Sequence, residues 1–168
     1  YFIIPIVGLG VLADGVLRFG VMMFNKRSRK EEWQVALAST YHDHVIVCGL
    51  GKLGYRVVCQ LLDFGEEVVG GEQAADRPFV SVLRQMNVPV IISDARRRDV
   101  LKQAGVEHAL AVVACTQDEL TNLDIALDAR ELNQAIKVVM RMFDAELAKK
   151  IERGFGIHTA FSVSSLAA

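Results

Sequence analysis

From residue 44 onward, short apolar runs alternate with longer stretches in which apolar residues recur every three or four positions. The short runs predict six buried strands, Val45–Cys48, Glu67–Val69, Val90–Ile92, Leu110–Ala114, Ile136–Met142 and Ile157–Phe161. The longer stretches predict five helices, Leu53–Phe64, Pro78–Met86, Asp99–Ala104, Glu119–Leu132 and Ala145–Arg153. Because a helix follows each of the first five strands, the pattern predicts an α/β domain with a doubly wound parallel sheet.

The first predicted strand runs directly into a glycine-rich segment that opens the first helix. Gly49 lets the chain turn sharply, Gly51 leaves room for a pyrophosphate beside the backbone, and Gly54 lets helix and strand pack closely. The N-terminal N–H groups of the helix would then point at the phosphates. Strand, glycines and helix together predict a Rossmann-like nucleotide site. We expect its loop to comprise Gly49, Leu50, Gly51, Lys52, Leu53 and Gly54.

An acidic residue, Glu72, comes just after the second predicted strand, beyond Gly70 and Gly71, and lies 18 residues beyond Gly54. A carboxylate at this position can accept hydrogen bonds from ribose hydroxyls, and it would repel a 2′-phosphate. This favours NAD or an adenine nucleotide over NADP, although Arg77 lies nearby in sequence. The alternative is a solvated acid at the end of a strand.

Two further polar segments follow strands at the expected ligand-binding edge of the sheet, and one charged residue lies within a strand. Asp94 and Ala95 come after the third strand, and Thr116 comes after the fourth. Arg141 lies within the otherwise apolar fifth strand, where a charge needs a partner. A nucleotide phosphate and a local carboxylate are equally good partners at this stage.

The first 24 residues are almost wholly apolar, and a basic cluster, residues 25–30, follows them. Twenty-four helical residues span about 36 Å, enough for a hydrocarbon core of about 30 Å, so we expect a transmembrane segment. The basic cluster predicts a cytoplasmic end for this segment. A signal peptide and a buried helix of a soluble protein are the alternatives. Asp14 and Arg18 are spaced to pair on one helix face, and the alternative for Asp14 is a pore mouth.

The expected organisation is therefore a membrane segment (1–24), a basic juxtamembrane linker (25–42) and a nucleotide-binding domain (43–168). The chain has 168 residues and begins with Tyr, so we expect it to be part of a longer protein. Its net charge of −1 disfavours nucleic acid as a partner. Three cysteines without a C-x-x-C spacing indicate buried free thiols in a reducing compartment. The four histidines do not cluster in sequence, and neither a catalytic constellation nor a metal site is expected.

The segments 44–62, 93–132 and 136–144, with Glu72 between them, resemble the RCK family, the regulators of K⁺ conductance, also called KTN or TrkA-N. The resemblance covers about residues 43–161, and 7–24 resemble the end of a channel's inner helix. It implies that the glycine loop, Glu72, Asp94, Ala95, Thr116 and Arg141 bind NAD(H), with ATP, ADP or AMP as alternatives. Some relatives bind Ca²⁺ through carboxylates after the fifth strand. Arg141 and Phe143 occupy that stretch here, which speaks against such a site.

The resemblance also implies self-association into dimers and rings, attachment to the membrane, and K⁺ flux in the parent protein. We therefore expect a non-catalytic, cytoplasmic nucleotide sensor of a potassium channel or transporter at the cell membrane. The alternatives are a regulatory domain of a cation–proton antiporter and a membrane-tethered NAD-dependent oxidoreductase.

Overall fold

The computed structural model describes residues 14–18, 31–144, 146, 148 and 150, and the backbone of 159–162. The chain divides into two units, Tyr1–Trp33 and Gln34–Ala168. In the first unit residues 14–18 are helical, and Arg18 Nε donates to Asp14 Oδ2 at 2.7 Å, which confirms the predicted pairing. Within the described ranges, no helix has the length and apolarity needed to cross a membrane. Most of the predicted membrane segment and the basic cluster lie outside the described residues.

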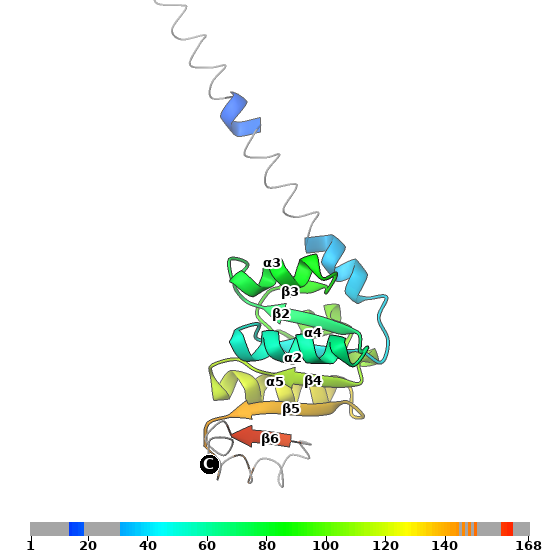
Figure 1. Ribbon diagram of the computed structural model, residues 1–168, viewed down its shortest axis with the longest axis vertical. Helices are drawn as coiled ribbons and strands as arrows, with labels where there is room; N and C mark the ends of the chain where they lie inside the picture. Colours follow the sequence, from blue (N-terminus) through cyan, green and yellow to red (C-terminus); the bar gives the residue numbers. More distant parts are fainter. Residues whose placement is uncertain are drawn as a thin grey trace, which may run out of the picture. The chain divides into compact units, whose positions relative to one another are not determined.

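The second unit is built on one parallel sheet, which confirms the predicted Rossmann-like class (Figure 1). Its strands run in the order β3-β2-β1-β4-β5-β6, so the chain winds outward from β1 in both directions. The strands are β1 (Val45–Cys48), β2 (Val68–Glu72), β3 (Val90–Ile92), β4 (Ala111–Ala114), β5 (Lys137–Met142) and β6 (Thr159–Ser162). The helices are α2 (Lys52–Asp63), α3 (Pro78–Gln85), α4 (Arg98–Gln103) and α5 (Glu119–Leu132), with a short 3₁₀ helix η1 (Val106–His108).

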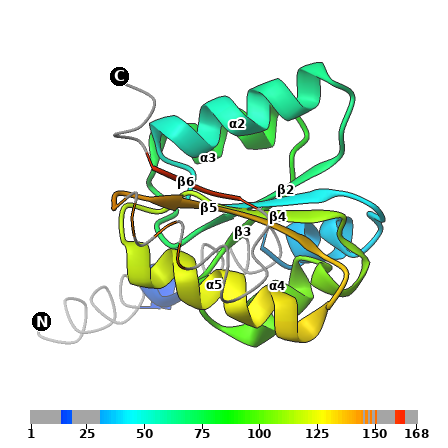
Figure 2. The same ribbon diagram turned by 90° about the horizontal axis from the view of Figure 1, so that it is seen from below.

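Helices cover both faces of the sheet, α2 and α3 on one and α4 and α5 on the other (Figure 2). Successive residues of β1 point to opposite faces, so Ile46 enters the core on the α4–α5 side and Val47 the core beneath α2 and α3. Both are buried, which explains why the strand reads as an unbroken apolar run rather than an alternating one.

The second strand differs from the prediction, because it continues through Gly70 and Gly71 to Glu72. Glycines usually interrupt strands, yet here they leave room for neighbouring side chains. A Cβ at Gly70 would lie 3.0 Å from Leu50 Cδ1, so the small residue admits the Leu50 side chain into the core. Glu72 is therefore the last residue of the strand, whereas the predicted strand ended three residues earlier, at Val69.

The predicted linker is also partly built into the second unit. Residues 31–38 are helical, Ala38 is fully buried, and Val35 and Tyr41 pack against the core on the α4–α5 side. Gln34 Oε1 accepts a hydrogen bond from Val90 N at 2.9 Å, on the free edge of β3. Residues from 34 onward thus belong to the nucleotide domain's fold, upstream of the expected boundary at 43.

The C-terminal elements are described only in part. Residues 146, 148 and 150 are helical, within the predicted helix after β5, and the other residues of that helix lie outside the described part. The last strand, β6, pairs with β5 and overlaps the predicted strand at residues 159–161.

Candidate functional site

The glycine loop leaves β1 at the carboxyl edge of the sheet, between β2 and β4. Gly49 has φ of +92°, a conformation that side-chain-bearing residues rarely adopt, and its N–H donates to Gly71 O at 2.8 Å. A Cβ at Gly49 would lie only 2.9 Å from Thr116 N. A Cβ at Gly54 would lie 1.9 Å from Gly49 O, so α2 approaches the loop as closely as backbone allows. The turning and packing roles predicted for these two glycines are confirmed.

Gly51 has a different environment, because no described atom lies within 4 Å of the position that its Cβ would occupy. It precedes Lys52, the first residue of α2, and both are exposed. This helix end has no side-chain cap, and a helix N-terminus whose first N–H groups lack such a cap is the setting in which helices bind phosphate. Leu50 and Leu53, in contrast, pack their side chains into the core beneath α2 and α3.

Glu72 joins the glycine loop to the end of β2 through its carboxylate. Oε2 accepts from Leu50 N at 2.8 Å, and Oε1 accepts from Gln73 N at 2.9 Å and Ala74 N at 3.3 Å. The side chain is half-buried. The acid is therefore bonded to the backbone rather than merely solvated, and one lone pair remains on Oε2 for a ribose hydroxyl.

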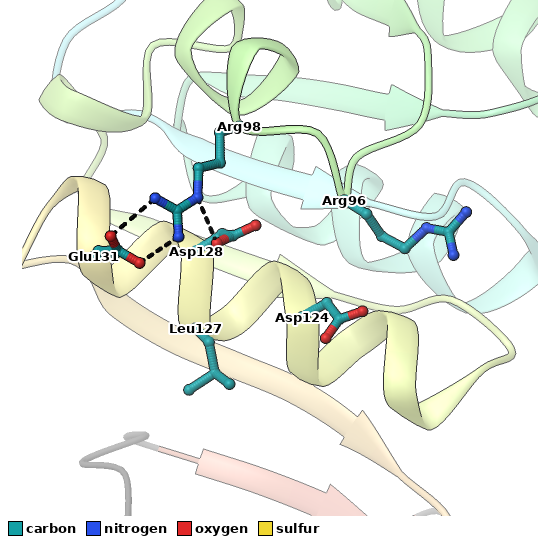
Figure 3. A pocket seen from close by; sticks show the side chains of 6 residues that line it. All are labelled: Arg96, Arg98, Asp124, Leu127, Asp128 and Glu131. Atoms are coloured by element: carbon teal, nitrogen blue, oxygen red, sulfur yellow. Dashed lines mark hydrogen bonds and ion pairs between the residues drawn. The ribbon is translucent and has the colours of Figure 1, made fainter.

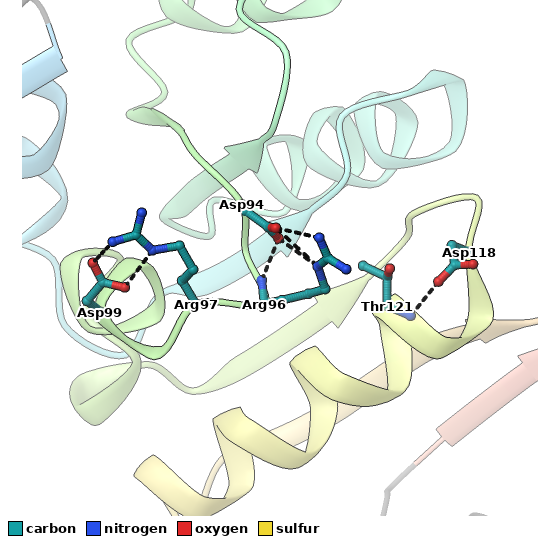
Figure 4. A network of polar contacts seen from close by, with 6 residues as sticks. All are labelled: Asp94, Arg96, Arg97, Asp99, Asp118 and Thr121. Atoms are coloured by element: carbon teal, nitrogen blue, oxygen red, sulfur yellow. Dashed lines mark hydrogen bonds and ion pairs between the residues drawn. The ribbon is translucent and has the colours of Figure 1, made fainter.

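Asp94 lies after β3 and is held by an arginine that the sequence reasoning did not single out (Figure 4). Arg96 donates from Nη2 to Asp94 Oδ2 at 2.6 Å and from its backbone N to Oδ1 at 3.0 Å. The hydrogen bond from the Arg96 side chain lowers the pKa of Asp94, so the carboxyl stays ionised. Ala95, between them, packs against the core on the α4–α5 side.

Thr116 is fixed by Asn122, a fully buried residue of α5. Asn122 Oδ1 accepts from Thr116 N at 2.9 Å and from Thr116 Oγ1 at 2.7 Å, while its Nδ2 donates to Arg141 O at 2.9 Å. One amide thus ties together the ends of β4 and β5. In the sequence its only signal is its place in the segment 93–132, which resembles the RCK family.

Arg141 forms no ion pair within the described part of the chain, so the choice between a phosphate and a local carboxylate as its partner stays open. Its guanidinium carbon lies 4.5 Å from the centre of the Phe143 ring, and its Nε is buried without a hydrogen-bond partner in the described part. Its charge lies close enough to Cys115 to favour the thiolate, yet burial raises the pKa of this thiol to about 11. Burial also raises the pKa of Cys48 to about 12, so both thiols stay protonated at neutral pH.

A shallow groove of about 360 Å³ lies between the start of α4 and the exposed face of α5 (Figure 3). Arg98 crosses it, donating to Asp128 Oδ1 at 2.9 Å and forming a second ion pair with Glu131. The other lining residues are Arg96, Asp124 and Leu127. None of the predicted nucleotide-binding residues lines this groove, so it is separate from the glycine loop.

The structure brings three of the four histidines together, whereas the sequence predicted that the histidines do not cluster. The rings of His42 and His108 are stacked, with centroids 5.2 Å apart and planes inclined by 29°. His44 is fully buried nearby, within electrostatic reach of both. The two segments are far apart in sequence, which is why spacing alone did not reveal the contact; His158 lies outside the described residues. Among described residues, no three His, Cys, Asp or Glu side chains converge on a possible metal site.

The sequence model of the TrkA-N domain matches residues 45–163 of this chain. Over 112 residues the chain is 27% identical to the voltage-gated potassium channel Kch of Escherichia coli, covering 66% of the chain and 27% of Kch. Over 115 residues it is 30% identical to the glutathione-regulated potassium-efflux system protein KefC of an Enterobacter species, covering 68% of the chain and 18% of KefC. The chain therefore spans well under half the length of these curated relatives.

Solved structures share the fold. The TrkA-N domain of the inner membrane protein ybaL from Escherichia coli superposes with a TM-score of 0.67 at 21% identity, covering 76% of this chain and 92% of that one. The Kef CTD of Shewanella denitrificans in AMP-bound form gives 0.63 at 22% identity, covering 74% and 73%. The GsuK channel bound to NAD gives 0.64 at 14% identity, covering 75% and 22%. At these identities the likeness establishes the architecture alone.

Proposed function

The chain belongs to the TrkA-N domain family, and from this premise we propose that it is the nucleotide-sensing regulatory module of a potassium channel or K⁺ efflux transporter. Its ligand is NAD(H) or an adenine nucleotide, and binding at the carboxyl edge of the sheet biases the module between two states that control K⁺ flux. The role is binding rather than catalysis.

The open glycine loop is the observation that carries this proposal. Gly51 faces free space at the start of α2, while Gly49 and Gly54 are packed against backbone and so serve the fold. Because a Cβ at Gly51 would meet no described atom within 4 Å, a diphosphate can approach this backbone and accept hydrogen bonds from the helix end. Glu72, already bonded to Leu50 N, is the acid available to the adenosine ribose, and Arg141, whose Nε has no hydrogen-bond partner among the described residues, is available to a phosphate.

The relatives support both the ligand class and the process. Kch is a potassium channel and KefC a potassium-efflux protein, and two structural neighbours were solved with AMP and with NAD. The match to KefC keeps the regulatory domain of an efflux antiporter as the second candidate. In either case the module lies on the cytoplasmic side of the cell membrane, attached through residues 1–24, and self-associates into a dimer or ring.

A thermal-shift series on the full chain with NAD⁺, NADH, NADP⁺, ATP, ADP and AMP tests the ligand assignment. A ligand at a hundredfold excess over its Kd stabilises the fold by about 2.7 kcal/mol, which raises the Tm of a chain of this size by about 5–10 °C. We expect such a shift with NAD(H) or an adenine nucleotide and a smaller one with NADP⁺. A panel without any shift, in protein that unfolds cooperatively, would contradict the proposal.

A further inference from the structure

At the amino edge of the sheet, opposite the glycine loop, the segment that enters β1 is bound to the turn between α4 and β4. Asp43 N donates to His108 O at 2.9 Å, and Leu110 N donates to His44 O at 2.9 Å. Asp43 itself has φ of +56°, an uncommon conformation for a residue with a side chain. These backbone bonds bring the three histidines of the two segments together.

His44 is enclosed on every side that the structure describes. Its ring is fully buried, and a Cβ on Gly105 would lie 3.0 Å from its Cε1 and 3.7 Å from Ala38 O. Nε2 donates to Ala104 O at 2.8 Å, because a carbonyl oxygen can only accept. Nδ1 is therefore the unprotonated nitrogen, and it is buried without a hydrogen-bond partner. A second proton on this ring would put both a charge and an unsatisfied N–H in the core.

His42 and His108 close the same junction from outside. Both are exposed, and one ring comes from the segment before β1 and the other from η1. A neutral ring stacks well on a neutral or a charged one, but two imidazolium rings at 5.2 Å repel each other. Protonation of both therefore opposes the contact between the segments.

We propose that His42, His44 and His108 form a proton-sensitive latch that holds residues 34–43 on the nucleotide domain near neutral pH and releases them on acidification. The released segment includes Gln34, which is bonded to Val90 N, and Ala38, which is fully buried, so these two contacts would be lost with it. In the full protein the latch would make the connection between the membrane segment and the nucleotide domain dependent on pH. This role rests on the proposed function.

The surrounding charges agree with this direction. Burial is the largest influence on His44 and lowers its pKa, whereas the carboxylate of Glu67, before β2, favours the charged ring more weakly. Asp43 and Glu107 flank the stacked pair along the chain and are exposed, so water screens their attraction for the two rings. Tyr41, whose ring meets His44 edge-on at 6.1 Å, stays neutral because burial raises its pKa.

Proton linkage determines whether the latch is weakened by acid or by base. In the latched state His44 holds its proton less tightly than a free histidine, whose pKa is about 6.5. Released His44 therefore binds more protons, and the latch is stable above that pH and weakens as the pH falls through it. One such histidine makes the opening constant rise about tenfold per pH unit below 6.5, until the pKa of the latched state is reached.

Hydrogen exchange of the full chain without nucleotide, between pH 7.5 and 5.5, tests the latch. After correction for intrinsic exchange, we expect the opening constant of the amides of residues 41–45 to rise several-fold, up to about tenfold, on acidification. Amides in the middle of α5 serve as the internal control and should stay unchanged. Because no ligand is present, the outcome is independent of whether the proposed function holds.

Two variants identify the proton sites. His44→Gln keeps a donor for Ala104 O and cannot titrate, so most of the rise should disappear. The double variant His42→Asn with His108→Asn changes only exposed rings and keeps the test available if His44→Gln does not fold. It should show a smaller rise than the wild-type chain. A wild-type opening constant that is flat from pH 7.5 to 5.5, or an equal rise in all variants, overturns the proposal.

Discussion

Gly51 and Gly54 belong to one motif but should respond to substitution in opposite ways. A Cβ at Gly54 would lie 1.9 Å from Gly49 O, about 1.5 Å short of the distance at which ordinary contacts begin. A Cβ at Gly51 meets no described atom within 4 Å. We therefore expect Gly54→Ala to damage the fold and Gly51→Val to damage nucleotide binding.

The magnitudes separate the two variants clearly. The neighbour of Gly54 is a backbone carbonyl, so relief of the clash must move α2 against β1, and overpacking of this kind costs about 3 kcal/mol. For a chain of this size that lowers the Tm by about 6–12 °C. Gly51→Val replaces a tolerated helix-cap residue with a poor one, at about 1 kcal/mol or less. Its side chain would occupy the phosphate space, and we expect affinity to fall at least tenfold, about 1.4 kcal/mol.

Thermal unfolding followed by circular dichroism and titration calorimetry with the nucleotide that gives the largest thermal shift measure both effects. Gly51→Ala is the matched control, since its smaller side chain should weaken binding less than Val does. A Tm of Gly54→Ala equal to that of the wild-type chain would contradict the packing role of Gly54. An unchanged nucleotide affinity of Gly51→Val would contradict the phosphate site.

Three further predictions concern other parts of the chain. Glu72→Ala should narrow the preference for NAD⁺ over NADP⁺ in calorimetry, because it removes the repulsion against a 2′-phosphate, and equal affinities in the wild-type chain would remove Glu72 from the site. Asn122→Ala should lower the free energy of unfolding by about 2–4 kcal/mol in urea, because it leaves backbone groups at the ends of β4 and β5 unpaired; a loss below 0.5 kcal/mol would contradict this. A ten-residue Gly/Ser insertion between Lys30 and Glu31 should preserve nucleotide affinity and abolish ligand-dependent K⁺ flux of the parent protein in liposomes, whereas a normal response would exclude the linker as the mechanical path.

The fold could be predicted because both faces of the sheet are covered. Burial on two sides makes each strand a continuous apolar run, as in β1 and β4, and the intervening helices fix the parallel winding. The prediction shortened the second strand because Gly70 and Gly71 look like breakers. Their place in the strand depends on Leu50, which comes from another element and fills the space above Gly70. Such a contact is tertiary and leaves no trace in local periodicity.

The site could be predicted only as far as its parts follow strands. Because parallel strands end at one edge, Gly49, Glu72 and Thr116 come together as expected. The sequence could not indicate that the side chain of Arg96 binds the carboxylate of Asp94. Nor could it indicate that the guanidinium of Arg141 lies over the ring of Phe143. Side-chain partners at such positions depend on rotamers and loop paths, whereas the position of a strand end depends on the backbone alone.

Few contacts separate the helical residues 34–38 from the glycine loop. Val90 lies on the edge strand β3. Its N–H donates to Gln34 Oε1, and its carbonyl oxygen accepts from Arg84 Nη2 at 2.8 Å, so side chains rather than another strand bond these two backbone groups. The same strand ends at Ile92, and the next residue, Ser93, donates its N–H to Glu72 O at 3.0 Å just before Asp94. Movement of Gln34 therefore acts on the strand that carries one side of the nucleotide site, while the histidine junction fixes the other end of the same segment. We therefore expect that a nucleotide bound at the proposed site and shifting the β3 end would change how residues 34–43 are held, and by linkage a force on those residues would change nucleotide affinity.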